Sequence, residues 1–316
     1  MKDFNCFISK ILNSSIFPRQ KIPLIPVSDT ILITGGSKGL GLKLVEKFLE
    51  KDFKVINLDV IKPPDNLSIY KNNHRLVFIN FDLSDVNNFT NLPNYLSMHN
   101  ISFGEIRVII NNAGLVSANN LDQTLPSLIE KTIRVNYESS VLLLLNLDLF
   151  INKATSTLIV NIASVLGLIT PPSLSLYGAS KKALIKFHLH LTEISKYDNH
   201  IDSLLIIPGQ INTTMFNNVK TPNRILAPIL KSDALAQKIF EKILERNNCF
   251  FGTVWQNNLF DKPASIFYAP FYIGVIPIFK TLPGWIIDAL RRLSGMDQAM
   301  KNYLPIKSKK LESTKI

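Results

Sequence analysis

The fold is decided by residues 30–41, which read TILITGGSKGLG. Residues 30–34 form a short apolar run that glycine stops, as in a buried strand of a parallel sheet. Residues 39–52 follow with apolar side chains at helical spacing. Glycines between a strand and a helix let the backbone turn tightly and approach a pyrophosphate, and the helix N-terminus offers free N–H groups to it. The stretch therefore predicts a strand–loop–helix unit that binds a dinucleotide.

The same alternation of strands and helices continues to about residue 254. Short apolar runs predict further strands at residues 55–58, 76–81, 106–110, 158–162 and 201–207, with a seventh at 249–254. Helical spacing covers residues 126–151, 176–197 and 232–246. This order is typical of right-handed βαβ units. We expect an α/β fold with a doubly wound parallel sheet.

Composition sets the organisation of the chain. The 316 residues are 46% hydrophobic and 19% charged, which is enough apolar material for a full core and excludes disordered and collagen-like chains. Two cysteines imply no disulfide framework and favour a reducing compartment. We expect a flexible lead over residues 1–27, a dinucleotide-binding domain over 28–254 and a hydrophobic C-terminal extension over 255–316.

The C-terminal extension contains an uncharged stretch, residues 263–279. Prolines at 270 and 277 interrupt it, and it is shorter than the roughly 20 apolar residues of a spanning helix. It predicts either a helix in a membrane interface or a lid over a substrate pocket. Nearby cations favour the membrane, since anionic headgroups attract them; they are Arg291, Arg292, Lys307, Lys309 and Lys310.

A phenol and an ammonium group are predicted side by side. Tyr177 and Lys181 are four residues apart on an expected helix, so they share one face. A nearby cation stabilises a phenolate and lowers the pKa of the tyrosine, which suits proton transfer near neutral pH. Ser164 follows a strand and can donate to the same substrate oxygen. The pattern predicts general acid–base chemistry.

Cofactor choice depends on two charged residues. Asp59 ends the second strand, where a carboxylate accepts hydrogen bonds from ribose hydroxyls and repels a 2′-phosphate. This favours NAD. Lys38 lies inside the glycine loop and could attract a 2′-phosphate, which leaves NADP open.

Together, these motifs resemble the short-chain dehydrogenase/reductase superfamily. The resemblance rests on the glycine loop, on the sequence NNAG at residues 111–114, and on Ser164, Tyr177 and Lys181. It covers residues 30 to 254 and implies a single Rossmann-like domain. The sequences LPGW at residues 282–285 and LRRLSG at 290–295 resemble the retinol dehydrogenase and 17β-hydroxysteroid dehydrogenase-like branch.

The resemblance also implies roles for individual residues. The implied catalytic residues are Asn136, Ser164, Tyr177 and Lys181, with Asn136 holding a water in a proton relay. The implied cofactor-binding residues are Gly35, Ser37, Lys38, Gly39, Leu40, Gly41, Asp59, Asp82, Leu83, Asn112, Ala113, Gly114, Tyr177, Lys181, Pro208, Gly209 and Thr213.

The expected function is hydride transfer between a nicotinamide cofactor, with NAD favoured, and the CH–OH or C=O group of a lipophilic alcohol or ketone such as a retinoid, a steroid or another lipid. One alternative is an NADP-dependent carbonyl reductase, and another is a non-catalytic dinucleotide-binding scaffold on a membrane surface. The five histidines lack metal-ligand spacing, so no metal is expected.

The net charge of +11 and the leucine run at residues 142–145 bear on partners and location. No basic stripe alternates with aromatic residues, so nucleic acid is not expected as a partner. The leucine-rich helix matches one that the superfamily uses for dimerisation, which predicts a homodimer. We expect a cytoplasmic location, with contact to endoplasmic reticulum or lipid droplets from the cytoplasmic side.

Overall fold

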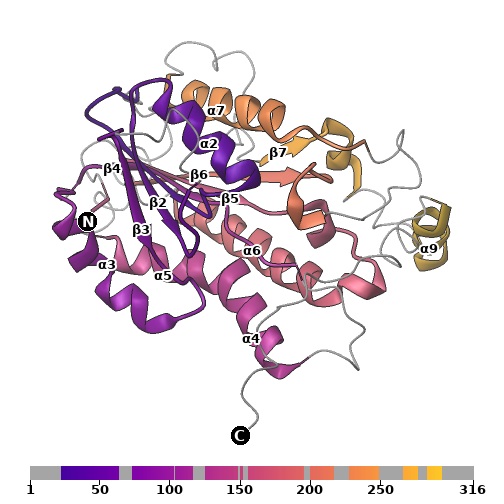
Figure 1. Ribbon diagram of the computed structural model, residues 1–316. Helices are drawn as coiled ribbons and strands as arrows, with labels where there is room; N and C mark the ends of the chain where they lie inside the picture. Colours follow the sequence, from indigo (N-terminus) through magenta and orange to yellow (C-terminus); the bar gives the residue numbers. More distant parts are fainter. Residues whose placement is uncertain are drawn as a thin grey trace, which may run out of the picture.

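The computed structural model describes residues 23–63, 73–102, 104–116, 125–148, 150–151, 156–195, 200–216, 228–248, 266–276 and 283–293. Its centre is one parallel sheet with the strand order β3-β2-β1-β4-β5-β6-β7 (Figure 1). The strands are β1 (Thr30–Thr34), β2 (Lys54–Asp59), β3 (Leu76–Asn80), β4 (Ile106–Asn111), β5 (Thr157–Ile162), β6 (Ile201–Pro208) and β7 (Ile266–Ala269).

Helices cover both faces of this sheet. They are α2 (Gly39–Leu49), α3 (Val86–Met98), α4 (Pro126–Ile133), α5 (Ser139–Asn146), α6 (Ser175–Ile194) and α7 (Ser232–Asn248). Helix α9 (Gly284–Leu293) lies away from the sheet in Figure 1. Figure 1 shows α2 and α7 on one face and α3 to α6 on the other. The doubly wound parallel sheet predicted from the sequence is confirmed.

Two apolar cores lie between the sheet and its helices. On the first face, Leu44 and Phe48 of α2 pack with Phe240 of α7 and with the inner side chains of the strands. On the second face, Phe89 of α3 and Leu143 of α5 pack against the opposite side of the same strands. Since the central strands are buried on both faces, most of their residues are apolar, which explains why short apolar runs located them.

The described strand beside β6 lies later in the chain than the stretch in which the sequence predicts a seventh strand. Residues 249–254 lie outside the described residues, and the strand next to β6 is β7, at Ile266–Ala269. That strand belongs to the uncharged stretch in which an interfacial helix or a lid was expected, so the helix prediction is wrong for residues 266–269. These residues are apolar because β7 pairs with β6 in the sheet, and a short 3₁₀ helix, Phe271–Val275, follows.

The helix predicted over residues 126–151 is interrupted and shorter. A π-helical turn, Arg134–Glu138, joins α4 to α5, and α5 ends at Asn146. Leu147 and Ile151 keep an apolar spacing because they are buried in the second core, and Ile151 forms a bridge with Ile106. Apolar spacing therefore continued beyond the end of the helix.

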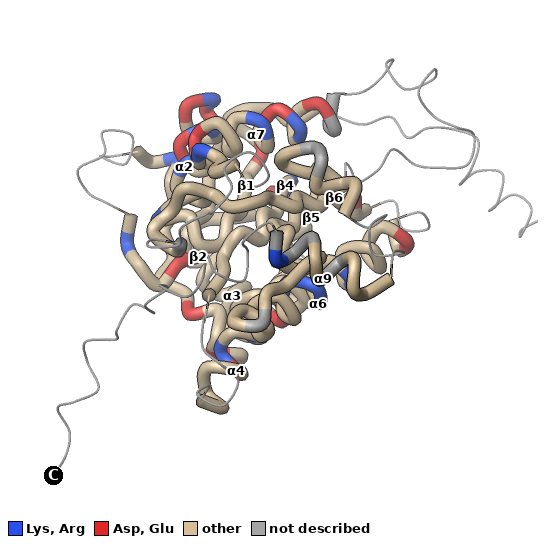
Figure 2. Tube along the Cα trace, turned by 90° about the vertical axis from the view of Figure 1, so that its right-hand side faces the viewer, with Lys and Arg blue, Asp and Glu red and all other residues tan. Residues whose placement is uncertain are grey.

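The surface helices carry both signs of charge. Figure 2 shows Lys and Arg interspersed with Asp and Glu along α2 and α7. Lys47 of α2 lies 3.7 Å from Asp233 of α7, so these charges pair between neighbouring helices. In the part of the chain that the structure describes, no helix is long and apolar enough to cross a bilayer.

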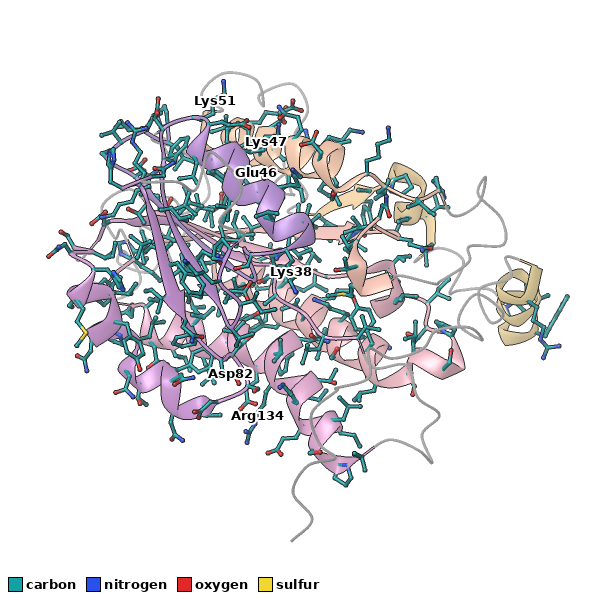
Figure 3. The ribbon with its side chains drawn as sticks, in the orientation of Figure 1. Lys38, Glu46, Lys47, Lys51, Asp82 and Arg134 are labelled. Atoms are coloured by element: carbon teal, nitrogen blue, oxygen red, sulfur yellow. The ribbon has the colours of Figure 1, made fainter. Side chains whose placement is uncertain are left out.

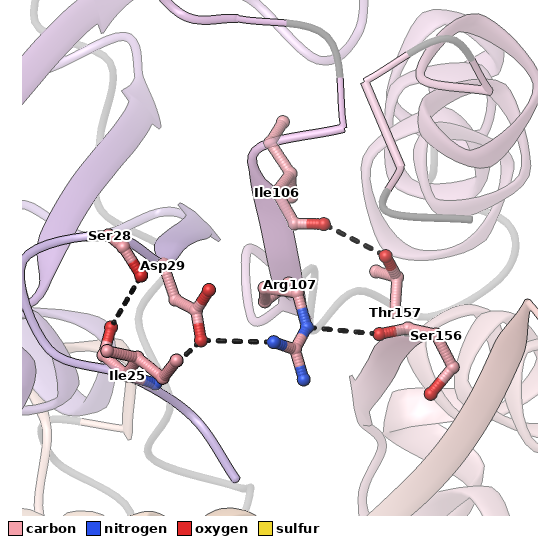
Figure 4. Close-up of polar contacts among 7 residues, drawn as sticks. All are labelled: Ile25, Ser28, Asp29, Ile106, Arg107, Ser156 and Thr157. Carbon is pink, nitrogen blue, oxygen red and sulfur yellow. Dashed lines mark hydrogen bonds and ion pairs between the residues drawn. The ribbon is translucent and has the colours of Figure 1, made fainter. Parts of the chain in front are cut away.

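A buried ion pair closes the amino-terminal edge of the sheet (Figure 4). Arg107 of β4 is 2% exposed, and its guanidinium donates to Asp29 Oδ2 at 3.1 Å and to the Ser156 carbonyl at 3.2 Å. The same Asp29 oxygen accepts from the Ile25 backbone N–H at 2.7 Å. The pair joins the segment before β1 to β4 and to the start of β5.

Candidate active site

The glycine loop after β1 and the first turn of α2 have no room for side chains at Gly35, Gly36 and Gly41. A Cβ on Gly35, where φ is +67°, would lie 2.9 Å from Ala113 Cα. A Cβ on Gly41 would lie 2.1 Å from the Gly35 carbonyl oxygen. Lys38 begins α2 without a side-chain cap, so the N–H groups of the first helical turn remain available to an anion. This cradle fits a dinucleotide pyrophosphate.

Asp59 lies beside the glycine loop, as the sequence predicts. The Ser37 N–H donates to Asp59 Oδ2 at 3.0 Å, and the Ile61 N–H donates to Oδ1 at 3.1 Å. These bonds hold the carboxylate at the end of β2. Lys38 is exposed at the start of α2, where Figure 3 labels it.

Asp82 and Leu83 follow β3 on the neighbouring strand end. Asp82 Oδ1 accepts hydrogen bonds from the backbone and the hydroxyl of Ser84 at 2.8 and 2.7 Å. Burial raises the pKa of this carboxyl, but the Ser84 hydrogen bonds and the charge of Lys131 together hold the pKa below its ordinary value. Arg134 donates to the Ser84 carbonyl at 3.2 Å, so α4 and its π turn support this segment (Figure 3).

The segment after β4 is tied to the glycine loop. Thr34 Oγ1 accepts from the backbone N–H groups of Asn112 and Ala113, both at 3.0 Å. The Asn112 side chain donates to the carbonyls of Thr34 and Gly35 at 3.0 and 3.1 Å. The carboxyl ends of β1 and β4 therefore form one edge, at the point where the strand order reverses.

Asn136 lies in the π-helical turn and is buried. Its Oδ1 accepts from the Leu115 N–H at 2.7 Å, and its Nδ2 donates to the Leu115 carbonyl at 2.9 Å and to Ser180 Oγ at 2.9 Å. π-Helical turns inside α-helices are frequent at functional sites. A Cβ on Gly114 would lie 3.4 Å from Asn136 Oδ1 and 3.6 Å from Lys181 Nζ, which brings these three residues together.

Ser164, Tyr177 and Lys181 meet at the carboxyl end of β5. Ser164 follows β5, and its side chain is hydrogen-bonded with the Tyr177 phenol. Tyr177 and Lys181 lie on α6, and both are buried. Lys181 Nζ donates to the Ile162 carbonyl at 2.9 Å. The constellation that the sequence predicts is therefore assembled in space.

The pKa of Tyr177 differs in sign from the sequence-based expectation. Burial raises it to about 12, and the hydrogen bond with Ser164 opposes only part of this effect. Burial lowers the pKa of Lys181 to about 8. The ammonium group of Lys181 contacts the Ile162 carbonyl, and the surroundings of Tyr177 are apolar. Desolvation therefore sets the direction of the shift in the pKa of Tyr177.

Pro208, Gly209 and Thr213 close the site from the β6 side. Pro208 ends β6, and the Gly209 N–H donates to the Ala269 carbonyl at 2.7 Å. A Cβ on Gly39 would lie 3.2 Å from Thr213 Cγ2, so Thr213 borders the glycine loop. The loops after β1 and β6 thus approach each other across the sheet edge.

Sequence reasoning assigned no role to three polar residues of this region. Thr34 joins two loops, and Ser180 Oγ connects Asn136 to the Tyr177 carbonyl at 2.7 Å. Asn57 of β2 contacts the glycine loop from below. The sequence does carry a signal for Asn57, because it is a polar residue inside the otherwise apolar strand VINL at residues 55–58.

Comparison with known proteins gives the family. Residues 29–224 match the short chain dehydrogenase family. The chain belongs to the short-chain dehydrogenase/reductase family. As a member, it is an enzyme of the oxidoreductase class, and the superfamily predicted from the motifs is confirmed.

Several relatives of this short-chain dehydrogenase/reductase are known. It is 32% identical over 305 residues to the uncharacterized oxidoreductase YDL114W of Saccharomyces cerevisiae, covering 94% of this chain and 90% of the relative. It is 26% identical to rat 17-beta-hydroxysteroid dehydrogenase 13, covering 70% of this chain and 74% of the relative. The structure of 4-hydroxyisoleucine dehydrogenase complexed with NADH is 28% identical with a TM-score of 0.58, covering 69% of this chain and 91% of that one.

Proposed function

We propose that this enzyme transfers hydride between NAD and the CH–OH or C=O group of a lipophilic alcohol or ketone. The observation that carries the proposal is the meeting of Ser164, Tyr177 and Lys181 beside the cradle at the carboxyl ends of the strands. When bound, the nicotinamide supplies the hydride acceptor or donor. A non-catalytic scaffold needs no such constellation.

In this proposal, four side chains of the site transfer the proton to or from the substrate oxygen. Tyr177 keeps its proton at neutral pH, because burial raises its pKa to about 12, and so it is ready to protonate the oxygen of a carbonyl substrate. In the oxidative direction, the Tyr177 phenol first gives its own proton to the relay of Lys181 and water, and the phenolate so formed takes the hydroxyl proton of the substrate. Ser164 orients the substrate oxygen and stabilises its developing charge. Lys181 supports the phenolate that remains, and Asn136 positions a water in the relay.

Reduction should slow as the pH rises through about 8. Below that pH, Lys181 carries a positive charge that stabilises the Tyr177 phenolate left after proton donation; above it, this charge is lost because the pKa of Lys181 is about 8. The check is kcat/KM for ketone reduction from pH 6 to 10, with the NADH dissociation constant measured at each pH as control. A flat profile between pH 7 and 9 would contradict this role of Lys181.

NAD preference is proposed to depend on Asp59. Replacing it by alanine should reduce the preference for NAD over NADP, taken as the ratio of the two kcat/KM values, by about tenfold, because a negative charge near a 2′-phosphate is removed. The matched control is Asp85→Ala. Asp85 is the N-cap residue of α3, and its carboxylate accepts a hydrogen bond from the Asn87 backbone N–H. An unchanged ratio in Asp59→Ala would favour the NADP-dependent alternative, to which Lys38 would contribute.

A lipophilic substrate is supported by the surroundings of Tyr177. The Tyr177 side chain packs with Leu174, Val116 and Leu166. A substrate that reaches the Tyr177 phenol would therefore meet apolar side chains. The similarity to a protein named 17-beta-hydroxysteroid dehydrogenase 13 points to the same substrate class. The experiment that tests the function is turnover of NAD(H) and NADP(H) with long-chain alcohols, retinoids, steroids and their ketones. Absence of turnover with all of these would overturn it.

Membrane contact and location remain part of the proposal. In the sequence of α9, GWIIDALRRL, the two arginines follow the aspartate by three and four positions, a spacing typical of one helix face, and Trp285 is 73% exposed. A basic amphipathic helix with an exposed tryptophan suits the surface of an anionic membrane or a lipid droplet. We place the enzyme on the cytoplasmic side of such a surface. In this proposal, the segment 255–316 has two parts with different roles: β7 completes the sheet, and α9 contacts the membrane.

Homodimerisation is proposed through the face formed by α4, α5 and α6. Exposed apolar side chains gather on these three helices: Leu125 at the start of α4, Ile129, Leu145 and Leu189. Leu145 is 68% exposed. Exposed apolar groups on neighbouring helices mark protein interfaces. Residues 1–22 of the lead predicted over residues 1–27 lie outside the described residues, and the prediction is wrong for Leu24, which is buried in the first core. The binding domain over 28–254 remains the proposed organisation of the rest.

A further inference from the structure

Strand β2 carries a polar side chain inside the core. Asn57 is 0% exposed and lies between Ile56 and Leu58, which are buried in the second core. Burial of an amide costs free energy unless its donors and acceptors are hydrogen-bonded. An asparagine at this position therefore needs partners that compensate for its burial.

Those partners belong to the glycine loop. Asn57 Oδ1 accepts from the Gly36 N–H at 2.9 Å, and Asn57 Nδ2 donates to Ser37 Oγ at 3.0 Å. Asp59 lies two residues further on the same face of β2 and accepts from the Ser37 N–H at 3.0 Å. Two side chains of one strand thus hold consecutive N–H groups of the loop.

The contact with the loop is close. A Cβ on Gly36 would lie 2.5 Å from Asn57 Oδ1 and 2.8 Å from Val45 Cγ2. The hydrogen bond with Asn57 fixes the backbone of Gly36, and this in turn fixes the position at which α2 begins. The Ser37 N–H is also fixed, and with it the carboxylate of Asp59.

We infer that Asn57 is a positioning residue of the dinucleotide site, acting through Gly36, Ser37 and Asp59. This inference rests on the proposed binding of a nicotinamide dinucleotide at the loop. Asn57 sets the affinity for the dinucleotide and its discrimination between NAD and NADP. It leaves the proton transfer at Tyr177 unchanged, because that group is placed by β5 and α6.

The test compares Asn57→Ala with Thr157→Val. Thr157 is also a buried strand residue with a side-chain hydrogen bond, to the Ile106 carbonyl at 2.9 Å, but it lies at the amino-terminal edge of the sheet. Both variants should be less stable to urea. Asn57→Ala should raise the NADH dissociation constant about tenfold, measured by fluorescence titration, and Thr157→Val should change it less than about twofold.

Kinetics separate positioning from general damage. In Asn57→Ala, kcat at saturating NADH should stay within about twofold of wild type while the KM for NADH rises, and the preference between NADH and NADPH should fall. If Asn57→Ala does not fold, Asn57→Thr keeps a buried hydroxyl whose shorter side chain cannot reach Gly36 and Ser37 together. That variant should weaken NADH binding in the same direction.

The outcomes distinguish the inference from the function on which it rests. A folded Asn57 variant that binds NADH as the wild type does would overturn the positioning role alone. An equal loss of affinity in Thr157→Val would show a general effect of instability and would also overturn it. Wild-type protein that binds neither NADH nor NADPH would overturn the proposed function and this inference together.

Discussion

Tyr177→Phe should lower kcat by about 10²–10⁴-fold while the NADH dissociation constant stays within a few-fold of wild type. The substitution removes only the phenol oxygen, and the ring can still pack with Leu174 and Leu166. General acid–base catalysis accounts for a rate loss of this size. The measurements are steady-state turnover with the substrate panel and fluorescence titration with NADH.

The matched control for this substitution is Tyr95→Phe. Tyr95 packs edge-on against Phe81 in the second core, on α3, and has no part in the site. The control should turn over substrate at close to the wild-type rate. If Tyr177→Phe retained activity within a few-fold of wild type, Tyr177 would not be the proton donor, and the mechanism would need another acid.

Asp29→Ala should lower the free energy of unfolding by about 3–5 kcal/mol. The guanidinium of Arg107 would stay buried without its carboxylate, and the Ile25 N–H would lose its acceptor. Breaking one side of a buried ion pair costs more than the pair contributes, because an uncompensated charge remains in a medium of low polarity. Urea denaturation followed by circular dichroism measures the change.

Two comparisons isolate the buried charge as the cause. The double variant Asp29→Ala/Arg107→Met removes both charges and should recover much of the lost stability. Glu245→Ala breaks the pair with Lys242, which is solvent-exposed on α7, and should cost no more than about 1 kcal/mol. A loss in Asp29→Ala no greater than that in Glu245→Ala would show that the buried pair contributes little.

Strands buried on both faces were predictable, because each is a short run of mostly apolar residues. The pairing of β7 was not predictable, since a run of apolar residues with prolines around it is compatible with a strand, a membrane-facing helix or a lid. Only the register with β6 decides among these. Likewise, Ile151 follows the periodicity of a helix but is buried after the helix has ended.

The candidate site was predictable where residues lie in short motifs, as with Tyr177 and Lys181. Contacts between segments that are distant in the sequence could not be predicted from it. Asn57 is an example, because its hydrogen-bond partners Gly36 and Ser37 lie in another segment of the chain. The pKa of Tyr177 was predicted in the wrong direction because helical spacing shows a nearby cation but not the extent of burial. Desolvation depends on the whole fold.

Strand β7 also has a consequence for how the chain is made. Its residues leave the ribosome well after β6, and until then the backbone of Leu205 to Pro208 has no neighbour on that side. An unpaired edge of an apolar parallel strand invites pairing with other chains. The newly made protein therefore passes through an interval in which its sheet is open at β6, and late addition of β7 ends the exposure. Chaperone dependence during synthesis would be concentrated in that interval.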